Sequence, residues 1–129
     1  MNPFLISLVT FLALPNVLHS SHLYHQRELM VTTESTIESI KFAKYLKDYG
    51  VVKYSAYWCP NCLNQSELFG KQAYKELKVI ECAKDGLNSQ TQLCIDKQIN
   101  GFPTWEINGK LILGVLSLKE LSRLTGYKN

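Results

Sequence analysis

A pair of cysteines that closely follows an apolar run, Cys59 and Cys62, constrains this chain more than any other feature. Residues 51–56 are rich in β-branched and aromatic side chains, as a buried strand is. Residues 59–69 then take up a helical pattern, and Pro60 falls in the first turn, where no backbone N–H is required. The sequence therefore predicts a strand that leads into a helix, with Cys59 at the helix N-terminus.

This position predicts redox chemistry for the two thiols. The unpaired N–H groups and the positive dipole end of a helix favour a thiolate over a thiol. We therefore expect Cys59 to be the attacking sulfur. Cys62, one turn further in, should be less accessible and should resolve the mixed disulfide that Cys59 forms.

A zinc site and an inert pair of thiols are the alternatives. Structural zinc takes four ligands, usually as two close pairs, but eleven residues separate the other cysteines, Cys82 and Cys94. No histidine follows Cys62. Redox chemistry is therefore favoured, and we expect no metal and no bound cofactor.

The composition indicates a single domain. The chain has 129 residues, and 46% of them are hydrophobic, which is enough for a compact core. Fourteen Lys and Arg residues against eleven Asp and Glu residues give a net charge of +3, without long runs of one sign. Nothing in this pattern marks a nucleic-acid surface, and we expect a monomer.

The first residues differ from the rest of the chain. Residues 4–14 are apolar and uncharged, and Pro15 interrupts them. Such a stretch is too short to cross a bilayer, but it matches the apolar part of a secretory signal, although the preceding basic residue and a clear cleavage site are missing. We expect residues 1–19 to be a signal peptide or short membrane anchor, and residues 20–33 to be a linker.

The folded domain is expected at residues 34–129 and begins with a helix. Ser35 and Glu38 match a capping box, and Gly50 ends the helical pattern. The side chains expected to face the core are those of Ile37, Ile40, Phe42, Tyr45, Leu46 and Tyr49.

The helix that begins at the dithiol is expected to continue to about Leu77. Gly70 should mark a bend or a close contact within it, because glycine is unfavourable in a helix interior. Residues 78–82 are predicted to form a second strand, which should be parallel to the first because a helix connects the two. Ser89 is then expected to cap a short helix that carries Cys94.

A hairpin and a last helix complete the predicted domain. Residues 105–107 and 111–113 should pair as antiparallel strands around Asn108-Gly109. Ser117 and Glu120 form a second capping box. The expected fold is α/β, with a central mixed four-stranded sheet flanked by helices.

Two motifs in this order resemble the thioredoxin superfamily. They are Trp58-Cys59-Pro60-Asn61-Cys62 after the first strand and Phe102-Pro103-Thr104 before the hairpin. More closely, four blocks are similar to the thioredoxin-like domain fused to vitamin K epoxide reductase homologues of cyanobacteria and plants. The blocks are residues 56–62, 67–73, 80–82 and 103–110. The resemblance runs from about Val31 to Tyr127 and implies a single thioredoxin-like domain of glutaredoxin size.

In that family the domain exchanges disulfides with exported proteins and with a four-helix membrane enzyme that reduces a quinone. The resemblance therefore implies that Cys59 and Cys62 form the redox shuttle, with protein thiols and disulfides as substrates and a quinone-linked membrane oxidoreductase as partner. It implies export to the periplasm or thylakoid lumen, or a membrane anchor facing that compartment. We expect either a separately encoded partner or a general thiol–disulfide role, with the apolar residues 4–14 as a remnant of such a fusion.

The resemblance also implies a substrate-binding surface. Pro103 matches the cis-proline of the superfamily, which lies against the dithiol and leaves the backbone of Phe102 free to pair with an extended peptide. Trp58 and Phe102 would flank the site as an apolar contact surface. The alternative for Pro103 is an ordinary loop proline.

Lys53 departs from the family pattern. Thioredoxins usually carry a buried aspartate six residues before the first cysteine, which serves proton transfer with the second, and Lys53 stands at that place here. A cation near the pair would favour thiolates and hence a more oxidising couple. The alternative is that the ammonium group points to solvent from a strand edge.

The remaining cysteines, Cys82 and Cys94, should lie near each other. Cys82 ends a strand parallel to the one before Cys59, and Cys94 follows on the next helix, within reach. A structural disulfide would close a loop of about a dozen residues and contribute about 3 kcal/mol. A relay disulfide would instead exchange electrons with Cys62. Either role favours an oxidising compartment.

Together these features predict an exported thiol–disulfide oxidoreductase that acts on protein cysteines. A glutaredoxin-like enzyme that uses glutathione is one alternative, although residues 114–117 lack the paired glycines that glutaredoxins use. A redox-dependent binding module, which docks through Trp58 and Phe102 without turnover, is the other.

Overall fold

The expected order of helices and strands is found in the computed structural model, which describes residues 30–128. The predicted leader, residues 1–19, and most of the predicted linker, residues 20–33, lie outside the described residues. The elements are α2 (Ile37–Tyr49), β1 (Val52–Ser55), α3 (Pro60–Phe69), α4 (Lys71–Glu76), β2 (Val79–Glu81), α5 (Thr91–Asp96), β3 (Thr104–Ile107), β4 (Lys110–Leu113) and α6 (Leu118–Thr125). No helix in residues 30–128 has the length and apolar character that crossing a bilayer requires.

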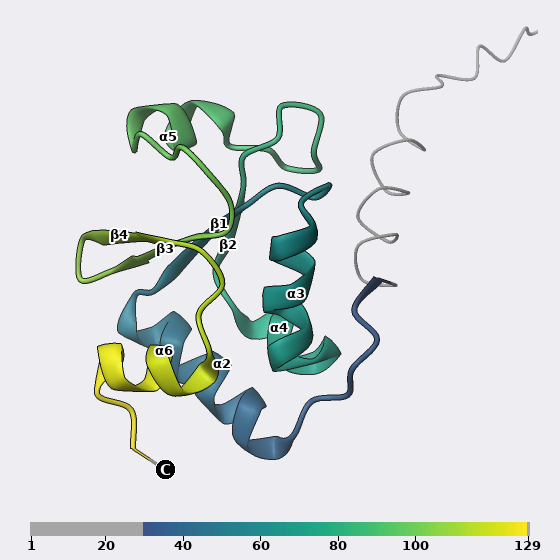
Figure 1. Ribbon diagram of the computed structural model, residues 1–129, viewed down its shortest axis with the longest axis vertical. Coiled ribbons are helices and arrows are strands. Elements are labelled where there is room, and N and C mark those ends of the chain that lie inside the picture. The colour runs from purple at the N-terminus through teal and green to yellow at the C-terminus, as the bar shows by residue number, and fades with distance from the viewer. Residues whose placement is uncertain (1–29, 129) are drawn as a thin grey trace, which may run out of the picture.

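The four strands form one mixed sheet in the order β2-β1-β3-β4 (Figure 1). β1 and β2 are parallel, whereas β1 pairs antiparallel with β3, and β3 pairs antiparallel with β4. The predicted parallel pair, the hairpin and the mixed four-stranded sheet are therefore confirmed. Because β1 is a central strand, the chain reaches the dithiol from the middle of the sheet.

The main core lies on the face of the sheet that carries Trp105 and Ile107 of β3. These side chains pack in one buried cluster with Leu46 of α2, Phe69 of α3 and Leu121 of α6. Figure 1 shows α3 and α4 beside the sheet, with α2 and α6 at the opposite end of the molecule from α5. Four helices thus bury this face, which holds α3 in a fixed position relative to β1.

The other face of the sheet is covered by the segment that contains α5. Tyr54 and Ile80 point to this side and form a second buried cluster with Cys82 and Cys94. Partly buried apolar side chains, among them Phe102, pack against this cluster. Both faces of β1 are therefore closed to solvent.

The first predicted helix is confirmed as α2, but its predicted cap is wrong. Thr36, not Ser35, is the N-cap, and its hydroxyl accepts a hydrogen bond from the backbone N–H of Ser39. The helix consequently begins with Ile37 in its first turn, where the side chain remains 67% exposed. Tyr49 in the last turn is also exposed, so these two residues of the predicted core-facing set lie outside the core.

The helix predicted to run from the dithiol to Leu77 is in fact two helices, α3 and α4, that meet at Gly70. This glycine has φ 83° and ψ 170°, a conformation that only glycine adopts readily. A Cβ atom here would also lie 2.6 Å from the backbone nitrogen of Ser35. Gly70 therefore makes both the bend and the close contact that the sequence suggested, but the bend ends the helix.

The cap predicted for the helix that carries Cys94 is also wrong. α5 begins at Thr91 with Gln90 as its N-cap, and the Ser89 hydroxyl is hydrogen-bonded to the Thr91 hydroxyl instead. The second capping box is confirmed, because Ser117 and Glu120 satisfy each other's backbone at the start of α6.

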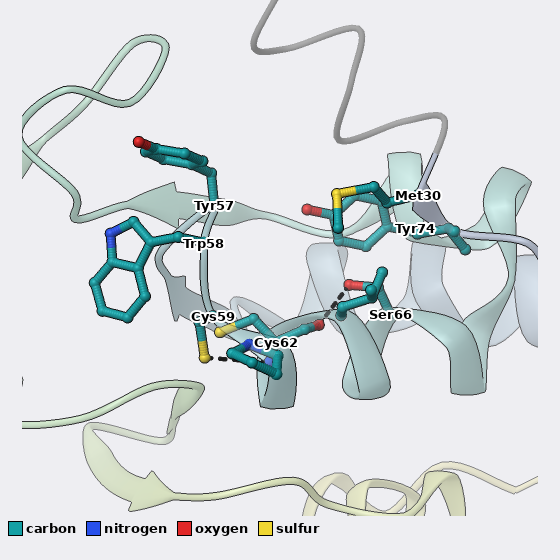
Figure 2. A pocket seen from close by; sticks show the side chains of 10 residues that line it. Met30, Tyr57, Trp58, Cys59, Cys62, Ser66 and Tyr74 are labelled. Atoms are coloured by element: carbon teal, nitrogen blue, oxygen red, sulfur yellow. Dashed lines mark hydrogen bonds between the residues drawn. The ribbon is translucent and has the colours of Figure 1, made fainter.

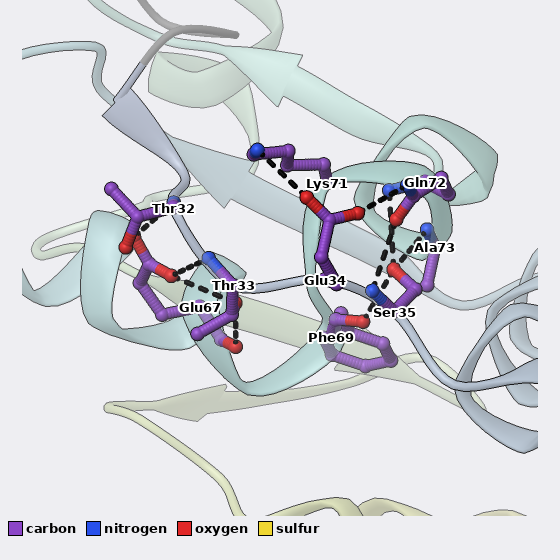
Figure 3. A network of polar contacts seen from close by, with 9 residues as sticks. All are labelled: Thr32, Thr33, Glu34, Ser35, Glu67, Phe69, Lys71, Gln72 and Ala73. Atoms are coloured by element: carbon purple, nitrogen blue, oxygen red, sulfur yellow. Dashed lines mark hydrogen bonds and ion pairs between the residues drawn. The ribbon is translucent and has the colours of Figure 1, made fainter.

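Residues 32–35 form a strap that is hydrogen-bonded across the junction of α3 and α4 (Figure 3). The Glu67 carboxylate accepts hydrogen bonds from the backbone N–H groups of Thr32, at 2.7 Å, and Thr33, at 2.9 Å. These bonds hold the pKa of Glu67 below its usual value. The Ser35 hydroxyl, which does not cap α2, accepts from the N–H groups of Gln72 and Ala73 at the start of α4.

Replacement of Gly70 by alanine should destabilise the domain by about 3 kcal/mol or more. Backbone strain in this region costs roughly 1–3 kcal/mol, and the overlap with the strap adds to it. Gly50→Ala is the matched control, because Gly50 also has a positive φ, 93°, but has open space around its Cβ position. It should lose only about 1–2 kcal/mol. Urea unfolding measures both, and equal losses would contradict the packing role of Gly70.

Candidate active site

Cys59 is the N-cap residue of α3, as the sequence predicted. Its φ and ψ are extended, −82° and 117°, and its Sγ accepts a hydrogen bond from the backbone N–H of Cys62 at 3.3 Å. Pro60 occupies the first turn, where a backbone N–H would have no partner within the helix, so that its absence costs no hydrogen bond. The sulfur thus lies at the N-terminal, positive end of the helix dipole.

Cys62 lies one turn further into α3 and is almost fully buried, at 3% exposure. Burial raises the pKa of the Cys62 thiol, whereas the hydroxyl of Ser55 and the positive charge of Lys53 act in the opposite direction. Cys59 is also buried, at 8% exposure, but its sulfur accepts from a backbone N–H at the start of α3. The groups that lower the pKa of Cys62 are the Ser55 hydroxyl, the Ala56 backbone and the Lys53 charge.

The loop before β3 brings the predicted substrate surface to the dithiol. The peptide bond between Phe102 and Pro103 is cis. The Cys59 thiol donates to the carbonyl oxygen of Phe102 at 3.5 Å. The rings of Trp58 and Phe102 meet edge to face with centroids 6.1 Å apart, and Trp58 is 59% exposed. The structure therefore brings Trp58, Cys59, Cys62, Phe102 and Pro103 together.

Lys53 does not point to solvent, so that interpretation of the sequence is wrong. The residue is completely buried, because β1 is a central strand and α3 covers this face. Its ammonium group donates to the carbonyl oxygen of Cys62 at 3.2 Å and to the hydroxyl of Ser66 at 3.1 Å. It also lies 5.2 Å from the centre of the Tyr74 ring. Lys53 therefore belongs to the dithiol site.

Glu81 is a part of this site that the sequence did not single out. Its carboxylate is buried and accepts hydrogen bonds from the backbone N–H groups of Tyr57, at 3.2 Å, and Ala83, at 2.9 Å. The bond to Tyr57 fixes the turn between β1 and Cys59, and the bond to Ala83 fixes the backbone after β2. A charged residue inside an otherwise apolar strand was the signal in the sequence that could have identified Glu81.

Gln65 is a second residue that sequence reasoning missed. Its buried side chain accepts from the Trp105 indole at 3.1 Å and from the backbone N–H of Leu116 at 2.7 Å. It also donates to the Leu116 carbonyl. Gln65 thus joins α3 to the sheet and to the segment before α6. No sequence pattern marked it, because its partners lie forty or more residues away.

A cavity of about 340 Å³ opens beside the two sulfurs (Figure 2). Its lining is mostly apolar and includes Met30, Tyr57, Trp58, Tyr74 and both cysteines. The lining also includes Ser66, whose hydroxyl donates to the Cys62 carbonyl. The cavity gives the neighbourhood of the buried Cys62 a contact with solvent on the side of α3 and α4.

Cys82 and Cys94 form a disulfide that links the end of β2 to α5. Both are buried, and they pack with Tyr54 and Ile80 rather than with the cluster that contains Cys59 and Cys62. Within residues 30–128, no group of three or more His, Cys, Asp or Glu side chains is arranged to bind a metal ion.

The sheet order, the connections and the dithiol at the start of α3 define a thioredoxin-like domain. No family model matches the chain. Over 100 residues the chain is 42% identical to "Thiol-disulfide oxidoreductase LTO1" of Arabidopsis thaliana. The match covers 75% of this chain but only 27% of the length of that relative.

Removal of the Cys82–Cys94 disulfide should lower stability without changing the chemistry at Cys59. The bond closes a loop across a sequence separation of 12. Loss of such a cross-link costs about 3 kcal/mol by the loop-entropy estimate. The Cys82→Ala/Cys94→Ala variant should therefore unfold at lower urea concentration, while its rate of disulfide exchange stays within about twofold of the parent. A large fall in exchange by the folded variant would instead identify a relay.

Proposed function

We propose that this domain is a thiol–disulfide oxidoreductase that acts on protein cysteines through Cys59 and Cys62. One observation carries the proposal: Cys59 caps α3, with its sulfur between the helix N-terminus and the Phe102 carbonyl, and Cys62 lies one turn below. This is the arrangement that an attacking thiol and a resolving thiol require. The name of the Arabidopsis relative supports the same activity.

In the oxidising direction, a substrate thiolate attacks the Cys59 sulfur of the Cys59–Cys62 disulfide. The bond between the two enzyme sulfurs breaks, and its electron pair leaves on Cys62 as a thiolate. A second substrate thiolate then attacks the substrate sulfur of the mixed disulfide and expels Cys59. The substrate loses two electrons and becomes a disulfide, the enzyme gains them as a dithiol, and the substrate's thiol protons pass to the enzyme thiols or to water.

The proposed substrate is an extended segment of a protein that presents its cysteine to Cys59. Trp58 is well exposed and Phe102 lies edge-on to it, so the two rings offer an apolar surface beside the sulfur. The Phe102–Pro103 backbone lies on the same side of Cys59. A peptide held by main-chain bonds at this loop would be recognised largely independently of its sequence.

We further propose that the domain works in an oxidising compartment, the periplasm or the thylakoid lumen, with residues 1–19 as its signal or anchor, followed by a linker that ends before the strap. The buried Cys82–Cys94 disulfide supports this, because such bonds persist where thiols are not kept reduced. A two-electron acceptor must regenerate the Cys59–Cys62 disulfide. The resemblance to domains fused to vitamin K epoxide reductase homologues favours a quinone-linked membrane oxidoreductase of that type.

The cysteine variants test the activity. With a disulfide-bonded peptide as substrate, Cys59→Ser should reduce exchange to the rate measured without protein, because no thiolate remains at the helix N-terminus. Cys62→Ser should still attack but should accumulate the mixed disulfide, visible as a peptide adduct by mass spectrometry. The Cys82→Ala/Cys94→Ala variant is the control for loss of thiols elsewhere. Peptide binding without turnover in the parent protein would support a binding module instead.

The direction of electron flow follows from the reduction potential of Cys59 and Cys62. Equilibration of the full chain with glutathione mixtures, followed by mass-spectrometric mapping of all four cysteines, measures it. An oxidant should have a potential near or above that of protein disulfide isomerase, about −180 mV. A potential close to that of thioredoxin, about −270 mV, would make the domain a reductant and contradict the oxidising role.

A further inference from the structure

A layer of buried polar side chains lies between the sheet and the first turns of α3. Lys53 and Ser55 lie two residues apart on β1 and therefore on one face, and Glu81 of β2 pairs in register with Ser55. All three are buried. Cys62 and Ser66 of α3 cover them from above, since the Lys53 ammonium group contacts both residues. Charged side chains are rarely buried this deeply unless they are paired or belong to a functional site.

The position of the Lys53 ammonium group is fixed from several sides. It donates to the Cys62 carbonyl and to the Ser66 hydroxyl, and Ser66 in turn donates to the same carbonyl at 2.8 Å. The face of the Tyr74 ring lies 5.2 Å away, at a distance where a cation is attracted. A lysine with four rotatable side-chain bonds is thereby held next to the residue that carries the second thiol.

The two thiols have different surroundings. The Cys59 sulfur accepts a hydrogen bond from the backbone N–H of Cys62 at the helix N-terminus. Cys62 lies inside the helix, and burial raises the pKa of its thiol. The Ser55 hydroxyl opposes this rise, and so does the charge of Lys53, whose ammonium group contacts the Cys62 carbonyl at 3.2 Å.

We propose that Lys53 is a positioning residue that stabilises the thiolate of Cys62. The inference rests on the proposed function, because it concerns the step in which Cys62 carries negative charge. In one direction the electron pair of the broken disulfide leaves on the Cys62 sulfur. In the other direction the Cys62 thiolate attacks Cys59 in a mixed disulfide and expels the substrate thiolate. Lys53 lowers the energy of the same charged state in both directions.

The inference predicts an effect on the equilibrium as well as on the rate. A buried cation stabilises the dithiol form, in which thiolate can exist, and it has no thiolate to neutralise in the disulfide form. Lys53 therefore makes the couple more oxidising.

Other titratable groups face this region, namely Glu81 from β2, Tyr74 from α4, Cys59 from α3 and Tyr57 from the turn before it. The variants below keep these side chains, and the second readout, which follows the Cys62 thiolate alone, separates its response from theirs.

The test compares the full chain with its Lys53→Met variant, which keeps an unbranched side chain one atom shorter but removes the charge. Equilibration with glutathione mixtures should show the variant shifted about tenfold toward the disulfide, which corresponds to about 30 mV for a two-electron couple. Lys44→Met is the matched control, because Lys44 is an exposed lysine of α2. It should leave the equilibrium within about twofold of the parent.

A second readout isolates Cys62. Reaction with Ellman's reagent places thionitrobenzoate on Cys59 and releases a first coloured anion. The attack of the Cys62 thiolate on this mixed disulfide then releases a second one, which is the release measured. The pH at which this release is half-maximal should rise by about one unit in Lys53→Met. Ser66→Ala, which keeps the cation but removes the hydroxyl that holds it, should shift the midpoint less. A purely structural lysine would change the unfolding midpoint but neither the equilibrium nor this pH profile.

The outcomes separate the two proposals. If the parent protein does not equilibrate with glutathione through Cys59, the proposed function fails. If the parent does so and Lys53→Met matches it in both equilibrium and pH midpoint, the role of Lys53 is overturned while the function stands. Lys53→Gln replaces the methionine variant if that variant does not fold, and the same two measurements decide.

Discussion

The hydrogen bond between the Cys62 amide and the Cys59 sulfur is the interaction on which the site depends. It exists because the chain passes from a strand to a helix within a few residues, and because Cys59 stands at the cap position of that helix. A serine or aspartate is the usual residue there, since its oxygen accepts the same bond. A cysteine at this position accepts the bond with sulfur, so the requirement for a helix cap and the requirement for a reactive thiolate are met by one atom.

The rest of the fold fixes the relation between β1 and α3. Glu81 fastens the backbone of the turn between them, and Gln65 ties the middle of α3 to the sheet. The strap over α3 and α4 uses the Glu67 carboxylate for the same purpose on the outer side. These three side chains share a feature: each accepts hydrogen bonds from backbone N–H groups of segments that have no helix or strand partner.

Much of this arrangement was predictable from local sequence patterns. The strand before Cys59, the parallel second strand, the Asn108-Gly109 hairpin and the Ser117 capping box all follow from signals within a few residues, and all are present. The errors at Ser35 and Gly70 have one common origin. Ser35 contacts α4 and Gly70 contacts Ser35, so each residue was determined by a neighbour about 35 positions away in the chain.

Lys53 shows the same limit at the site itself. Its position six residues before Cys59 raised two opposite interpretations, and the sequence could not choose between them. The choice depended on whether its strand lies at the edge or in the middle of the sheet. That is a property of strand order, which is set by the pairing of β1 with both β2 and β3.

The strap has a geometric consequence for whatever precedes it in the chain. Met30, at the start of the described residues, lines the cavity that also contains Cys59 and Cys62. The segment before residue 30 is therefore joined to the domain on the face where the dithiol reacts. A partner bound by this apolar lining would therefore contact the start of the described chain and the two sulfurs together.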